Sequence, residues 1–231
     1  MKTIGLLGGM SWESTREYYR LINEGIRERL GGLHSAEILM ASVDFAPLSE
    51  AMGAADWTKI ETILCDRARR LSGAGAEILL LCTNTMHKLA DKVAAAAQPA
   101  KFIHIGTCAA DEAVARGFRT VALLGTRFTM EEDFYRKHLE AAGRDVLIPD
   151  ASARHWINEL IFTDLCAGIF REDARRTMSD IVSALAEEGA EAVVLGCTEL
   201  PLILTGKESP LPILDTMTLH ARAAVDATLD S

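Results

Sequence analysis

The chain contains one short segment twice, and this repeat limits the folds open to it more than any other feature. The first copy, residues 75–85, is GAEILLLCTNT, and the second, residues 189–199, is GAEAVVLGCTE. Each copy is an apolar run that follows a glycine and ends in polar residues, which is typical of a buried strand in a parallel sheet. The constant offset of 114 residues, from Thr83 to Cys197, indicates two α/β halves related by duplication.

Apolar runs alternate with helical segments along the chain, and the run at 120–126 resembles that at 3–9. Such alternation favours doubly wound parallel sheets. We therefore predict two Rossmann-like α/β domains related by a pseudo-twofold axis, with the active site between them. The first domain is predicted at residues 1–98 plus 207–231 and the second at 99–206. Locally, we expect a loop from Pro47 to about Trp57 and one helix over 129–142.

Composition excludes several functions. Hydrophobic residues make up 49% and charged residues 25%, as in an ordinary globular protein. The net charge of −9 disfavours a nucleic-acid partner. No apolar stretch has transmembrane length and no cleavable signal opens the chain, so we expect no membrane partner. Five cysteines without CxxC spacing favour a reducing, cytoplasmic location over disulfides or a structural zinc site.

The repeat also singles out two side chains. Catalytic groups tend to lie just past the carboxyl ends of parallel strands, where Thr83 of the first copy corresponds to Cys197 of the second. Cys82 corresponds to Gly196 instead, and successive side chains of a strand point to opposite faces. We therefore expect Cys82 to be a small buried hydrophobe and Thr83 and Cys197 to be the functional pair.

A pair of strand-end groups suits the inversion of a carbon centre. One group removes a proton from one face while the other delivers a proton to the opposite face. A thiolate can be the base, and backbone N–H groups after Cys197 are expected to lower its pKa. A threonine hydroxyl is too weak an acid to be an alkoxide, so Thr83 is expected to donate or relay a proton. His87, four residues later, is expected to support or cap rather than to act as a base.

Four segments resemble the motifs of the cofactor-independent aspartate/glutamate racemase family. They are GGMSWEST at 8–15, NTMH at 84–87, GCTEL at 196–200 and DTMTLH at 215–220. The chain is most similar to the L-aspartate/glutamate-specific subgroup, in which the first catalytic position is threonine. The resemblance implies racemisation of an amino acid by two acid/base groups, faster from L to D, with no metal or organic cofactor.

The resemblance also implies roles for single residues. Thr83 and Cys197 are the implied catalytic pair. The implied substrate-binding residues are Met10, Asn84, Thr85, Thr198 and Glu199. In the family's arrangement, the asparagine and the two threonines would hold the α-carboxylate, the glutamate would meet the α-ammonium group, and the methionine would line the pocket. The expected partner is a small amino-acid substrate, and the chain could form a homodimer.

The chain departs from the family pattern where the substrate side chain would be recognised. Relatives that bind a distal carboxylate often have Lys-x-Gly after an isoleucine-rich helix, where this chain has Cys166-Ala167-Gly168. The segment 45–48 supplies no arginine either. The predicted substrates are therefore aspartate, glutamate or a related amino acid, with the side chain left open.

Two other functions are compatible with the same sequence. Sister families with this architecture use a strand-end cysteine as a nucleophile, for example in cis–trans isomerisation of a small dicarboxylate, and a covalent adduct would favour that function. The chain could also be a non-catalytic, two-lobed amino-acid-binding protein. Binding without exchange of the α-hydrogen would favour that interpretation.

Overall fold

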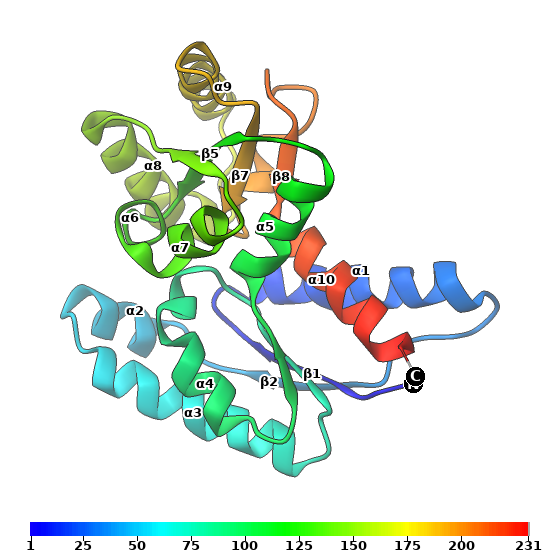
Figure 1. Ribbon diagram of the computed structural model, residues 1–231. Helices are drawn as coiled ribbons and strands as arrows, with labels where there is room; N and C mark the ends of the chain where they lie inside the picture. Colours follow the sequence, from blue (N-terminus) through cyan, green and yellow to red (C-terminus); the bar gives the residue numbers. More distant parts are fainter. Residues whose placement is uncertain (231) are drawn as a thin grey trace. The chain divides into compact units, whose positions relative to one another are not determined.

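The computed structural model describes residues 1–230, which form two compact units, each built on a four-stranded parallel sheet (Figure 1). The first unit contains residues 1–104 and the C-terminal segment that begins at His220. The second unit contains Ile105–Leu219. The predicted two-domain α/β fold is confirmed.

The first unit has the strand order β2-β1-β3-β4. Its strands are β1 (Ile4–Gly8), β2 (Ile38–Ser42), β3 (Ile78–Leu81) and β4 (Lys101–Ile103). Its helices are α1 (Trp12–Leu30), α2 (Ala46–Gly53), α3 (Trp57–Gly73), η1 (Thr85–Leu89), α4 (Ala90–Ala96) and most of α10 (Thr216–Leu229). Helices α1 and α10 lie on one face of the sheet, and α3 and α4 lie on the other (Figure 1).

The second unit repeats this order as β6-β5-β7-β8. Its strands are β5 (Thr120–Gly125), β6 (Asp145–Leu147), β7 (Ala192–Gly196) and β8 (Ile213–Asp215). Its helices are α5 (Ile105–Ala115), α6 (Arg127–Glu131), α7 (Asp133–Ala141), α8 (Ala151–Thr163), η2 (Leu165–Ala167), α9 (Glu172–Glu187) and η3 (Leu200–Leu202). Because β3 and β7 hold the same place in the two sheets, the topology agrees with a duplication.

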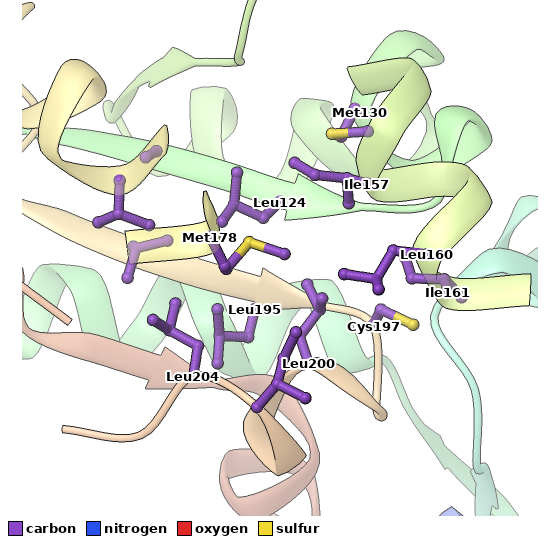
Figure 2. Packing of buried hydrophobic residues seen from close by; sticks show 14 of the residues in the cluster. Leu124, Met130, Ile157, Leu160, Ile161, Met178, Leu195, Cys197, Leu200 and Leu204 are labelled. Atoms are coloured by element: carbon purple, nitrogen blue, oxygen red, sulfur yellow. The ribbon is translucent and has the colours of Figure 1, made fainter. Parts of the chain in front are cut away.

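Successive side chains along the strands of the second unit point to opposite faces of the sheet, so a layer of core residues lies on each face. Val121 and Leu123 pack with residues of α5 and α7. Their neighbours Ala122 and Leu124 pack with residues of α8 and α9, part of which Figure 2 shows. Cys197 belongs to this second layer, so its surroundings are set by α8 and α9.

The chain passes between the units later than predicted, at 104/105 rather than 98/99 and at 219/220 rather than 206/207. Strand pairing gives the reason. β4 pairs with β3 and therefore belongs to the first sheet, and β8 pairs with β7 and belongs to the second. Each crossing follows the last strand of its sheet.

Two local predictions were wrong. The segment predicted as a loop contains α2, with Pro47 in its first turn, where a proline favours a helix because no hydrogen bond of its nitrogen is lost. The single helix predicted over 129–142 is divided into α6 and α7 by Glu132, which has extended backbone angles. No helix formed by residues 1–230 combines the length and apolar character needed to cross a bilayer.

Candidate active site

Thr83 and Cys197 occupy equivalent positions in the two units. Leu81 of β3 pairs in parallel register with β1, and Leu195 of β7 pairs in parallel register with β5. Thr83 and Cys197 follow these leucines by two residues, so both side chains lie just past the carboxyl end of a central strand. This is the placement that the overlay of the two copies predicts.

The backbone of Thr83 leaves the sheet in a tight turn. Its N–H donates to Leu81 O over 2.8 Å, and its carbonyl oxygen accepts from Nδ1 of His87 over 2.7 Å. The residue is 6% exposed. Within residues 1–230 its hydroxyl group makes no hydrogen bond, so it is available to a ligand.

The other predicted site residues of the first unit lie in two loops that leave neighbouring strands. Asn84 and Thr85 follow β3 and begin η1, and both are buried. Met10, also buried, lies between β1 and α1. Because β1 and β3 are paired and parallel, these two loops emerge at the same edge of the sheet.

A glycine fixes the shape of the loop after β1. Gly9 has φ +95°, and a Cβ atom added to it would lie 2.2 Å from the carbonyl oxygen of Val43. Its N–H donates to Oγ1 of Thr15 over 2.8 Å. Ser11 caps α1 by accepting from the N–H of Ser14.

In the second unit, the side chains of Cys197 and Thr198 both contact one oxygen atom of Glu199, and all three are predicted site residues. Glu199 Oε2 lies 3.1 Å from Sγ of Cys197 and 2.9 Å from Oγ1 of Thr198. A carboxylate only accepts, so the thiol and the hydroxyl donate to it. All three residues are buried, so this is a compact, buried hydrogen-bonded group.

The pKa of the Cys197 thiol is raised rather than lowered, contrary to the prediction from the sequence. Burial raises its pKa well above the ordinary range, and the negative charge of Glu199 and the neighbouring Cys166 raise it further. The backbone N–H of Glu199 lowers the pKa, as expected, but this effect is the smaller one. Figure 2 shows the reason, because Cys197 lies at the end of β7 near apolar side chains of α8. Cys197 is therefore a thiol at rest.

Cys82 has the structural role predicted for it. Its side chain is completely buried, and the only hydrogen bond of its thiol within residues 1–230 is a long one of 3.9 Å from Sγ to Leu80 O. Burial raises the pKa of its thiol. Cys82 therefore behaves as a small apolar side chain although it is adjacent to Thr83.

Three imidazole rings pack together in the first unit. The ring centroid of His87 lies 4.6 Å from that of His104 and 5.9 Å from that of His220. His220 accepts from the hydroxyl of Tyr18 and donates to Ile103 O, both over 2.9 Å, and burial lowers its pKa to about 4, so the ring is neutral. Among residues 1–230, no three His, Cys, Asp or Glu side chains are grouped to hold a metal ion.

Comparison with known proteins places the chain in a family. The model of the Asp/Glu/hydantoin racemase family matches residues 7–224. The solved structure of a candidate Asp/Glu racemase from Yersinia pestis superposes with a TM-score of 0.91 at 41% identity, and both chains are covered completely. An aspartate racemase homologue from Pyrococcus horikoshii gives 0.85 at 32% identity, again over both complete chains. The broad specificity amino-acid racemase RacX of Bacillus subtilis is 24% identical over 98% of each chain. The chain therefore belongs to the Asp/Glu/hydantoin racemase family, whose members are isomerases.

Proposed function

We propose that the protein is a cofactor-independent racemase in which Thr83 and Cys197 exchange protons at the α-carbon of one amino-acid substrate. The observation behind the proposal is the equivalent position of a hydroxyl and a thiol after the third strand of the two sheets. Membership of a racemase family agrees with this chemistry. The proposed substrates are L-aspartate, L-glutamate or related amino acids.

The proposed reaction begins with the thiol, because a protonated Cys197 cannot accept the α-hydrogen. Glu199 Oε2 lies 3.1 Å from Sγ and takes the thiol proton. The thiolate then removes the α-hydrogen of the L-enantiomer and becomes a thiol again, while the electron pair stays on the α-carbon. The hydroxyl of Thr83 protonates the opposite face of that carbon. Water replaces the proton of Thr83, and Glu199 returns its proton to water, so protons and charge balance.

The remaining site residues are proposed to bind the substrate. Asn84, Thr85 and Thr198 would hold the α-carboxylate with amide and hydroxyl donors, and Met10 would line the pocket. Glu199 would attract the α-ammonium group with its negative charge until it accepts the thiol proton. The same carboxylate would then serve binding and proton transfer in turn.

The two proposed acid/base groups, a thiol and a hydroxyl, differ in acidity, so we predict different kcat values for the two enantiomers. The thiolate serves the L-enantiomer, whereas the Thr83 hydroxyl must first lose its own proton before its oxygen can accept the α-hydrogen of the D-enantiomer, so kcat should be higher from L to D. The equilibrium constant is unaffected because enantiomers have equal free energies. A lower KM for the D-enantiomer must compensate for its lower kcat.

The proposal is tested by incubating the purified protein in D2O with a panel of L-amino acids that includes aspartate, glutamate and neutral side chains. We expect NMR to show loss of the α-hydrogen signal and formation of the D-enantiomer for at least one of them. Binding without exchange would instead identify an amino-acid-binding protein. A covalent adduct of Cys197 with an unsaturated dicarboxylate, without α-exchange, would identify a nucleophilic isomerase.

Glu199→Gln should have two opposite effects. Removing the negative charge should lower the pKa of the Cys197 thiol, because that charge raises it. Removing the proton acceptor should nevertheless lower kcat by ~10²-fold or more. Thiol alkylation as a function of pH measures the first effect, and α-hydrogen exchange measures the second.

An exposed carboxylate of the same unit provides the control for this variant. Glu208 bonds to Thr205 at the surface, so Glu208→Gln should leave both the thiol titration and the exchange rate as they are. A Glu199→Gln protein that binds substrate and exchanges at the wild-type rate would show that Glu199 does not accept the thiol proton.

A further inference from the structure

His87 is a buried imidazole for which the proposed reaction has no use. It lies in η1, four residues after Thr83, and is 2% exposed. Its Nδ1 atom is 2.7 Å from the carbonyl oxygen of Thr83. A carbonyl oxygen can only accept, so Nδ1 bears a proton and donates it to Thr83 O.

The hydrogen bond from His87 is one of two that hold the backbone of Thr83 in place. The last sheet hydrogen bond of this strand is donated by Cys82 to Leu7 O over 2.9 Å, one residue before Thr83. Beyond that point the Thr83 backbone is held by the turn to Leu81 O at its N–H and by the imidazole at its C=O. These two bonds set the position and direction of the Cα–Cβ bond from which the hydroxyl group projects.

The imidazole is itself held by the rings around it. Its centroid lies 4.6 Å from His104, 5.7 Å from Phe102 and 5.9 Å from His220. The contact with His104 is edge-to-face at 72°, and that with His220 is edge-to-face at 69°. A donor fixed by packing can hold a backbone carbonyl in one place, which a mobile side chain cannot do.

The second unit has no such donor. The offset of 114 residues places Pro201 opposite His87. The carbonyl oxygen of Cys197 accepts instead from the backbone N–H of Leu200, over 3.3 Å. The imidazole is therefore present only beside the hydroxyl, which is the weaker of the two proposed acid/base groups and depends more on accurate placement.

We propose that His87 is a positioning residue that directs the Thr83 hydroxyl at the α-carbon and thereby controls the half-reaction that uses Thr83. This inference rests on the proposed function. It predicts that replacing His87 slows proton exchange on only one face of the substrate's α-carbon, because Cys197 is held by contacts of its own in the second unit. A general loss of structure would affect both faces equally.

The test is His87→Leu, which removes the donor, compared with His87→Asn, whose side-chain N–H can occupy the place of Nδ1. Deuterium incorporation from D2O is followed separately for the L- and D-enantiomers. His87→Leu should slow exchange of the D-enantiomer by ~10–100-fold, as a small misplacement of a reacting group does. Exchange of the L-enantiomer should stay within about threefold, and His87→Asn should recover most of the D-enantiomer rate.

A matched control is His138 of the second unit, whose Nδ1 atom lies 3.2 Å from Oγ1 of Thr107. His138→Gln should leave the ratio of the two exchange rates unchanged. Should His87→Leu fail to fold, His87→Gln replaces it, since its amide lies one bond further from the backbone and misses the carbonyl.

Equal slowing of both enantiomers, or no slowing of either, by His87→Leu would overturn the inference. Failure of the proposed function has a different signature. In that case the wild-type protein exchanges no α-hydrogen, or Cys197→Ala exchanges it as fast as the wild type.

Discussion

Replacing Cys197 with alanine will abolish inversion of both enantiomers. It will also lower the rate of α-hydrogen exchange of the L-enantiomer by ~10²–10⁴-fold, which is the contribution of a well-placed acid or base. In the proposed reaction no other group can accept the proton on that face. The proposed carboxylate donors Asn84, Thr85 and Thr198 remain in the variant. Substrate affinity should therefore stay within about tenfold of the wild type, as titration calorimetry can show.

The matched control is Cys82→Ala, which removes a thiol one residue from Thr83. Cys82 is completely buried and makes no strong hydrogen bond. We expect this variant to lose ~1 kcal/mol of stability and to keep its racemase activity. Inactivation by Cys82→Ala together with full activity of Cys197→Ala would mean that the two copies of the repeat are overlaid in the wrong register.

Much of the fold is predictable because the signals for it are local. An apolar run after a glycine indicates a buried parallel strand, and two such runs at one offset indicate a duplication. The structure has the two sheets with the same strand order, and Thr83 and Cys197 follow the equivalent strands. The strand ends could therefore be located from the sequence alone.

The unit boundaries could not be predicted in the same way. They depend on which sheet accepts β4 and which accepts β8, and each of these strands is only three residues long. Pairing between strands far apart in sequence decides this, and a pattern within a short window contains no information about it. Pro47 posed a different problem, because proline is favoured both in turns and in the first turn of a helix.

The direction of the pKa shift of Cys197 was predicted wrongly for a related reason. The turn that follows the strand does offer a backbone N–H, and this N–H does lower the pKa. The larger effect comes from burial among residues of α8 and α9, which precede Cys197 by tens of residues. Likewise, the sequence predicts a supporting role for His87, but only the structure identifies the Thr83 carbonyl as the group it holds.

Replacing Thr83 with alanine will separate hydrogen exchange from inversion. In this variant Cys197 and Glu199 keep their hydrogen bond, so the thiolate can still form and remove the α-hydrogen of the L-enantiomer. The thiol then exchanges with solvent and returns a deuteron to the same face. No group delivers a proton to the other face, so formation of the D-enantiomer should fall by ~10²–10⁴-fold.

The two-base assignment is tested most directly by following the L-enantiomer in D2O with the Thr83→Ala protein and analysing the recovered L- and D-enantiomers separately by NMR and mass spectrometry. We predict that the recovered L-enantiomer gains deuterium at a rate within about tenfold of the wild type, while the D-enantiomer is formed at least ~10²-fold more slowly. Formation of the deuterated D-enantiomer at the wild-type rate would contradict the assignment of Thr83 as the second acid/base group.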